Sequence, residues 1–148
     1  MIDWIQLLVS FTGSLGFAYL FKLKGKNALW AGLAGGFAWF IYLVLEAFDV
    51  SYGMCMMFAG LGLGIYSEIM AILTKMPKTA YVSVGIIPLI PGAALYYTLF
   101  NFIQGSYGAC NQYALKAVIT AITIAGGLLI SMSFGEGIRR LKCEISRS

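Results

Sequence analysis

Apolar residues occur along this chain in five long runs, and the short segments between them carry most of the charged residues. A helix that crosses a membrane needs about 20 mostly apolar residues, and each run is close to that length. The pattern therefore predicts an all-α integral membrane protein of about five transmembrane helices in a single domain, residues 1–148. The expected spans are residues 2–21, 28–45, 53–74, 79–103 and 113–134, followed by a tail at 135–148.

The basic residues are distributed unevenly between the two sides that this pattern defines. Nine of the ten lysines and arginines lie in segments 22–26, 75–78 and 135–148, which an odd number of spans places on one side. Because cytoplasmic loops carry an excess of basic residues, the N-terminus is predicted outside and the tail in the cytoplasm. We therefore expect a multi-pass protein of the cell (inner) membrane. A four-span arrangement, with residues 79–103 as a re-entrant segment, is the alternative.

Composition narrows the classes of function. Hydrophobic residues make up 60% of the chain and charged residues only 11%, which leaves no room for a soluble catalytic domain. The net charge of +4 does not indicate a nucleic-acid partner, because the basic residues cluster in short loops between apolar runs. Histidine is missing and the cysteines show no metal-ligand spacing, so no metal, cofactor or enzymatic activity is expected. The sequence leaves open whether Cys55 and Cys110, both expected near the outer surface, form a disulfide.

Two prolines and a glycine interrupt the fourth apolar run near its middle, in the segment Ile86–Gly92 (IIPLIPG). Pro88 and Pro91 each lack an N–H group and disfavour helical geometry in the preceding residue, while Gly92 adds backbone freedom. The sequence therefore predicts a fourth helix that is broken at a PxxPG motif near the middle of the membrane. Such a break is tolerated only where it is buried in protein or lines a wet cavity, and the new helix start attracts anionic groups. A packing kink with no ligand is the alternative.

Polar residues inside the apolar runs are further candidates. Glu68 is the only acidic residue well inside a span, and placing a charge there costs about 2.5–3.5 kcal/mol, so we predict a role in proton coupling. An ion pair with Lys75 on the same helix face is the alternative. Asn101 lies on a polar stripe beyond the break and is predicted to line a substrate path. The pair Gly60 and Gly64 is typical of closely packed membrane helices.

The stretch Pro88–Tyr96 (PLIPGAALY) resembles the signature of the threonine/serine exporter family, in the second, five-span domain of its members. The EIMA and KMP segments at 68–71 and 75–77 are similar to the acid-to-proline run that precedes this signature. By this resemblance Pro88, Pro91 and Gly92 match the family motif. We assign them, with Tyr96 at the end of the stretch, to substrate binding.

The resemblance implies a membrane transporter subunit that exports a small carboxylate-bearing metabolite, either threonine and serine or a dicarboxylate such as succinate. It implies proton coupling, with Glu68 at an often acidic position, and a larger partner subunit of the same family that carries the other spans. A homo-oligomer is also open. The alternative is a non-transporting membrane subunit that assembles or stabilises the complex. An intramembrane enzyme is disfavoured, because paired intramembrane carboxylates are missing.

Overall fold

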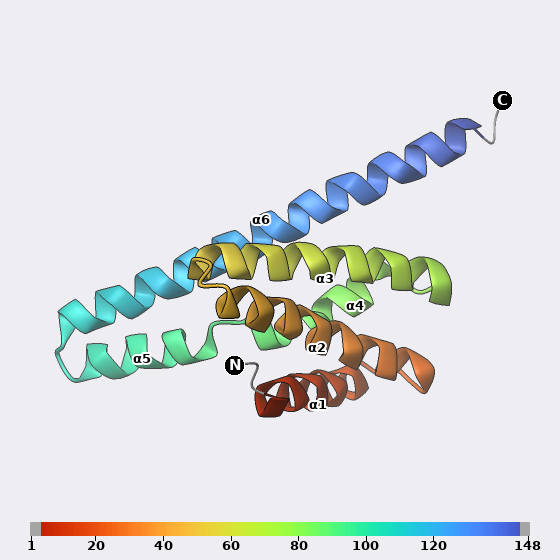
Figure 1. Ribbon diagram of the computed structural model, residues 1–148. Helices are drawn as coiled ribbons and strands as arrows, with labels where there is room; N and C mark the ends of the chain where they lie inside the picture. The colour runs from red at the N-terminus through yellow and green to blue at the C-terminus, as the bar shows by residue number, and fades with distance from the viewer. Residues whose placement is uncertain (1–3, 146–148) are drawn as a thin grey trace.

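The computed structural model describes the backbone of residues 4–145 and the side chains of residues 4–133. The described part consists of helices joined by short turns (Figure 1). In chain order these are α1 (Trp4–Leu20), α2 (Lys26–Ala47), α3 (Tyr52–Thr74), α4 (Lys78–Gly85), the 3-10 turn η1 (Ile87–Leu89), α5 (Gly92–Ile103) and α6 (Tyr107–Ile145).

Three helices of the described part are long and apolar enough to cross a membrane: α2, α3 and the segment Tyr107–Ser133 of α6. A fourth candidate is the pair Lys78–Leu89 and Gly92–Ile103, which passes the same test as a unit although it is bent by 49°. Helix α1 is apolar, but its described length of 17 residues falls short of a span. The protein is thus all-α with three or four candidate spans, while a fifth span at α1 and the orientation stay predictions.

The connections are tight turns at residues with left-handed backbone. Lys75 ends α3 with a φ of 56°, and Gly105 turns α5 into α6 with a φ of 72°. This last turn, residues 104–106, is shorter than the loop expected at 104–112. Residues 107–112 contain no proline and join the following helix, which then runs without interruption past residue 134 to Ile145.

Glycines allow the closest helix contacts. A Cβ added at Gly60 of α3 would lie 2.8 Å from the backbone oxygen of Ile124 on α6. One added at Gly127 of α6 would in turn meet the backbone oxygen of Met57 on α3. The two helices therefore approach backbone to backbone, as small residues permit in membrane proteins.

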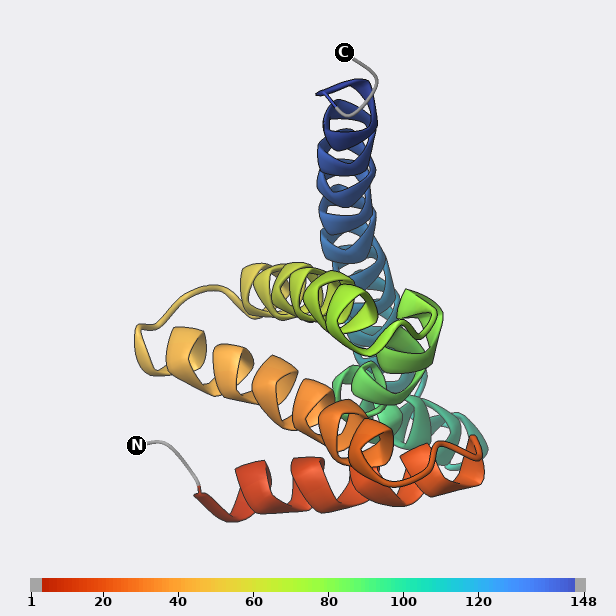
Figure 2. The same cartoon turned by 90° about the vertical axis from the view of Figure 1, so that its right-hand side faces the viewer.

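Helices α1, α2, α3 and α6 pack in that order, each against the next, and the interrupted segment packs mainly against α2 and α3. Helices α2 and α3 lie side by side, with α1 against α2 and α6 against α3 (Figures 1 and 2). The interrupted segment enters this core at η1, where Leu89 is 1% exposed and belongs to the same buried cluster as Leu63 and Ile124. The core thus fixes the position of the interruption.

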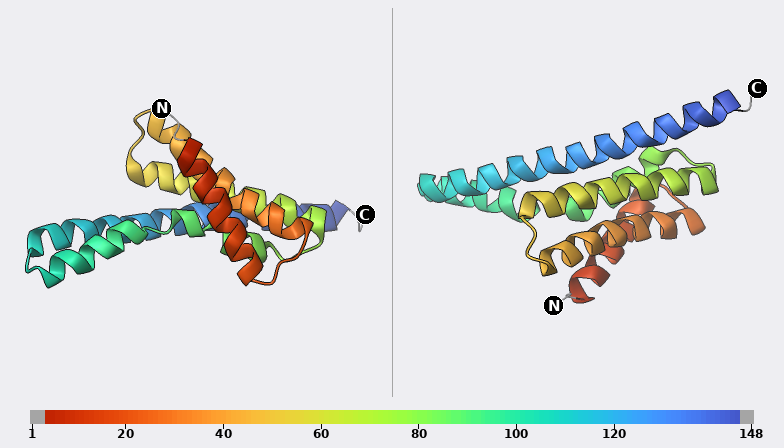
Figure 3. Two further views of the ribbon diagram at one scale, coloured as in Figure 1. Left: turned by 90° about the horizontal axis from the view of Figure 1, so that it is seen from below. Right: turned by 45° about the horizontal axis from the view of Figure 1, so that its top comes forward.

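Helix α5 leaves this core. It packs mainly against the first part of α6, and the two form a hairpin that extends past the ends of α2 and α3 (Figure 3). Large apolar side chains of the hairpin are exposed, among them Leu99 at 64% and Ile103 at 83%. These surfaces need an apolar environment such as lipid or another membrane protein.

Candidate functional site

The interruption between α4 and α5 has a defined backbone path. The last α4 hydrogen bond joins the Ile86 N–H to the Val82 oxygen at 3.0 Å, after which Pro88 has no N–H to continue the ladder. A single 3-10 turn follows, and Ile90 is extended with φ −61° and ψ 129°, as expected for a residue before proline. The chain therefore unwinds over residues 86–91 and resumes as a helix at Gly92.

The start of α5 leaves backbone donors free. The Gly92 N–H bonds the Ile90 oxygen at 2.7 Å, and the first regular bond of α5 joins the Leu95 N–H to the Pro91 oxygen at 3.0 Å. Between them, the N–H groups of Ala93 and Ala94 donate to no backbone oxygen in the described chain. A helix start of this kind carries partial positive charge and accepts anionic groups.

Ala93 and Ala94 are among the residues that line a cavity of about 290 Å³, which we call the break cavity. Helices α2, α3 and α6 supply the rest of its wall, mainly with aromatic side chains and one lysine. The lining residues are Trp39, Tyr52, Met56, residues 88–94, Tyr97, Tyr113 and Lys116. Pockets for small metabolites have this make-up, with mostly apolar walls and a few convergent polar groups.

Lys116 supplies the positive charge of the break cavity. Its Nζ lies 4.6 Å from the centroid of the Tyr52 ring, a cation–π contact. The Thr120 hydroxyl donates to the Lys116 carbonyl oxygen at 2.7 Å and lies 3.1 Å from the Tyr52 hydroxyl, which fixes that ring. Among residues 4–133, no carboxylate forms a salt bridge with Lys116, so its charge is available to an anion.

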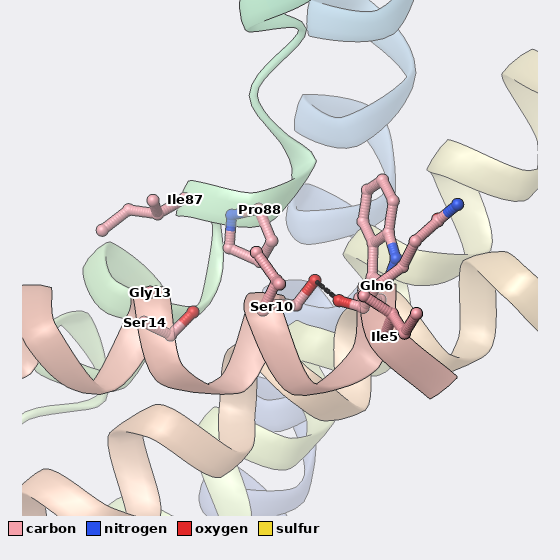
Figure 4. A pocket seen from close by; sticks show the side chains of 9 residues that line it. Ile5, Gln6, Ser10, Gly13, Ser14, Ile87 and Pro88 are labelled. Carbon is pink, nitrogen blue, oxygen red and sulfur yellow. Dashed lines mark hydrogen bonds between the residues drawn. The ribbon is translucent and has the colours of Figure 1, made fainter. Parts of the chain in front are cut away.

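A second cavity, of about 380 Å³, lies on the other side of η1 and is called the α1 cavity here. Its wall includes Ser10, Gly13 and Ser14 of α1, which face Pro88 of the interruption (Figure 4). Gln6 also lines it, and its backbone oxygen accepts from the Ser10 hydroxyl at 2.9 Å. No charged side chain is among the described residues of this wall.

The residues predicted to bind substrate divide into two groups. Pro88, Pro91 and Gly92 line the break cavity. Tyr96 does not line it: its side chain is 61% exposed and stacks on Phe100 with ring centroids 6.0 Å apart. Asn101 does not line it either, since its Nδ2 donates to the Tyr97 carbonyl oxygen on its own helix at 2.7 Å. Tyr97, one residue beyond Tyr96, takes the lining position.

Glu68 lies near the end of α3 and does not line either cavity. Its Oε2 is 3.5 Å from the Nζ of Lys78, the first residue of α4, and both side chains are largely buried. The alternative, an ion pair between Glu68 and Lys75, is wrong, because Glu68 pairs with Lys78 instead. Lys75 adopts the left-handed conformation that ends α3 and is exposed, whereas the turn folds Lys78 back beside Glu68.

Five aromatic or basic residues of the break cavity were not singled out from the sequence as binding residues. Tyr97 and Tyr113 stack with ring centroids 5.2 Å apart and close one wall, and Trp39 and Tyr52 form another. Lys116 had a sequence signal, because it is the only basic residue outside the three clustered segments. The sequence pattern alone favours a lysine at the membrane surface. The packing of α6 against α3, where Lys116 lies over the Tyr52 ring, places it in the cavity wall instead.

The remaining candidates for chemistry are the cysteines. Cys55 is a free, buried thiol in the core that contacts the Val50 oxygen at 3.4 Å, and Cys110 is a free thiol on α6. Within the part of the chain that the structure describes, no group of three histidine, cysteine, aspartate or glutamate side chains could hold a metal ion.

The fold and site define a multi-pass helical membrane protein whose interrupted helix opens on a cavity that contains a lysine. A family model described as "Threonine/Serine exporter, ThrE" matches residues 6–134, and the chain belongs to this family. The chain is also 25% identical over 116 residues to a protein described as "Probable threonine/serine exporter" from Mycobacterium tuberculosis (strain ATCC 25618 / H37Rv). That alignment covers 77% of this chain but only 22% of the relative, so the chain spans about a fifth of its length. No solved structure matches the chain.

Proposed function

We propose that this chain is a transporter subunit that exports a small carboxylate-bearing metabolite, with the carboxylate bound in the break cavity. The observation that carries this proposal is the meeting of two kinds of positive group in one cavity. Ala93 and Ala94, whose N–H groups donate to no backbone oxygen, line it from α5, and Lys116 lines it from α6. Broken helices in transporters use such starts to hold substrate carboxylates.

The family name and the mycobacterial relative favour threonine and serine as substrates. A dicarboxylate such as succinate would also suit the positive groups of the break cavity. We further propose that the chain works with a larger membrane subunit of the same family. Two observations support this: the relative is much longer, and the α5–α6 hairpin exposes apolar side chains that another membrane helix could cover.

Five spans, an outside N-terminus and a cytoplasmic tail in the inner membrane belong to the same proposal. Helix α1 would be the first span, and α4, η1 and α5 together would be one broken span. Glu68 is proposed as the proton-coupling residue. Its place near one end of α3, beside Lys78, suits a carboxylate that exchanges a proton with one face of the membrane.

Transport measured in inside-out vesicles tests the central proposal. Vesicles from cells that make the full chain with its native neighbours are expected to accumulate labelled L-threonine, L-serine or succinate in a saturable manner. Replacing both Pro88 and Pro91 by alanine restores helical hydrogen bonding and removes the free donors. This double variant is expected to lose at least tenfold in uptake.

The control is Pro77→Ala, which alters a proline in the turn before α4, away from both cavities. Assembly is followed separately, by the amount of chain that reaches the membrane and copurifies with its neighbours. Full uptake by the Pro88→Ala/Pro91→Ala variant would overturn the binding proposal. Loss of assembly with uptake per complex unchanged would instead favour the alternative, a subunit that only assembles or stabilises the exporter.

A further inference from the structure

The break cavity and the α1 cavity have two lining residues in common, Trp39 of α2 and Pro88 of η1. These two residues therefore form the partition between the two cavities. Trp39 packs on Tyr42 of its own helix, with ring centroids 4.8 Å apart, so the indole is held in place from one side by the core. Pro88 belongs to the only unwound segment of the fourth apolar run.

The partition and the α1 helix beside it each contain a buried polar group without a hydrogen-bond partner. The Trp39 Nε1–H has no accessible surface and no hydrogen-bond acceptor, and the same is true of the Ser14 hydroxyl, whose residue is 1% exposed. Ser14 differs in this from its helical neighbours Ser10 and Thr12, whose hydroxyls both donate to a carbonyl one turn earlier. In Figure 4 the Ser14 hydroxyl lies on the side of α1 that faces Pro88.

An unpaired buried donor is costly, about 1–3 kcal/mol, and native proteins rarely keep one without a use. An indole N–H can only donate, so its missing partner must be an acceptor oxygen. A hydroxyl can donate or accept, so Ser14 tolerates either kind of group. The two groups flank the one place where a ligand would have to pass between the cavities.

We propose that Trp39 is a substrate-binding residue, whose indole N–H donates to an acceptor oxygen of the exported metabolite at the partition, and that Ser14 lines the same path on the α1 side. The substrate path then runs through both cavities and past Pro88, with α1 as part of its wall. This inference rests on the proposed function. It adds the α1 cavity and two binding residues that the PxxPG motif does not contain.

A change of a single atom tests the role of Trp39. Replacing it by benzothienylalanine, through suppression of a stop codon at position 39, keeps the shape of the ring and substitutes sulfur for the N–H group. The KM for uptake into inside-out vesicles is expected to rise about tenfold, the value of one hydrogen bond to a charged acceptor, with the maximal rate retained. The same replacement at Trp30, which lines neither cavity, is the control.

Ser14 provides a second pair of variants. Ser14→Ala removes only the unpaired hydroxyl and is expected to raise KM several-fold. Thr12→Val is the control, because the Thr12 hydroxyl lies on the same helix but lines neither cavity and already donates to the Leu8 oxygen. An unchanged KM for the Trp39 and Ser14 variants would overturn the inference.

Substrate binding near Trp39 can be measured without transport, by tryptophan fluorescence. The chain has three tryptophans, so a variant with phenylalanine at positions 4 and 30 leaves Trp39 as the only one. The difference in emission between this variant and one that also carries Trp39→Phe, each in the purified complex, is expected to change saturably with L-threonine, L-serine or succinate, whichever the vesicles accumulate. Saturable transport by the wild type with no response from Trp39 defeats this inference and leaves the proposed function intact. Transport of none of the three probes defeats both.

Discussion

Lys116 is the residue whose environment most needs a functional explanation. It lies nine residues into α6, about 13 Å along the helix from Tyr107, within a segment apolar enough to cross a membrane. A lysine inside such a segment costs about 2.5–3.5 kcal/mol on insertion scales. The cation–π contact with Tyr52 offsets part of this cost, and a bound anion would offset more.

Lys116→Met is therefore expected to raise the KM for the carboxylate-bearing substrate at least tenfold, because methionine fills the space without the charge. Lys116→Arg keeps the charge and is expected to retain most of the affinity. Uptake into inside-out vesicles measures both. Lys24→Met, in the turn between α1 and α2, is the control for a general loss of positive charge. Equal KM values for the methionine and arginine variants would show that the charge is not used.

Glu68 can be tested against its own ion-pair partner. If Glu68 carries the coupled proton, Glu68→Gln is expected to abolish the stimulation of transport by a pH gradient while substrate exchange at equal pH continues. Lys78→Met breaks the same ion pair but keeps the carboxylate, so the stimulation should persist. Uptake with and without an imposed gradient measures this. If both variants keep the stimulation and lose the same stability, Glu68 only holds α3 and α4 together.

At the scale of the helices, the α3–α6 contact depends on which glycine of a neighbouring pair faces the partner. A Cβ at Gly127 would meet the backbone of α3, with the Leu61 nitrogen at 2.8 Å, whereas one at Gly126 would meet nothing within 4 Å. Backbone atoms cannot move aside as a side-chain end can. The two positions have the same helix propensity, so their difference isolates packing.

Gly126→Ala is expected to hold or raise thermal stability, since alanine is favoured over glycine in a helix by about 1 kcal/mol. Gly127→Ala is expected to lower stability by about 1–3 kcal/mol through overpacking. Thermal unfolding of the purified protein in detergent measures both. A Gly127→Ala protein as stable as the wild type would mean that α3 and α6 are not in backbone contact.

The interruption of the fourth apolar run could be read from the sequence, because a proline acts on its own helix through the missing N–H group. Which residues form the wall of the break cavity could not be read from the sequence. Tyr97 and Asn101 are four residues apart and share one face of α5, but of the two only Tyr97, nearer the start of the helix, lines the cavity. Trp39 and Tyr52 come from other helices, and their meeting with η1 depends on the 49° bend and on how α2 and α3 pack.

At the scale of the whole molecule, the predicted orientation follows from charges that lie in the turns. Single cysteines introduced at Lys24 or Lys75, in a chain whose native cysteines are replaced by alanine, are expected to react with a membrane-impermeant maleimide only after permeabilisation. Cysteines at Asp49 or Gly105 are expected to react in intact cells. All four residues lie outside the helices, so labelling depends on the side of the membrane. Labelling of Lys75→Cys and Gly105→Cys from the same side would favour the four-span, re-entrant arrangement.

The dependence of α5 on α6 has a consequence for how this protein is made. Helix α5 packs mainly against α6, and α6 is translated after it. During synthesis α5 therefore leaves the ribosome before its main protein neighbour exists, and its apolar side chains must first be held by the insertion machinery or by lipid. The α5–α6 hairpin can form only when α6 arrives, so a ribosome pause before residue 107 would prolong the period in which α5 has no partner helix.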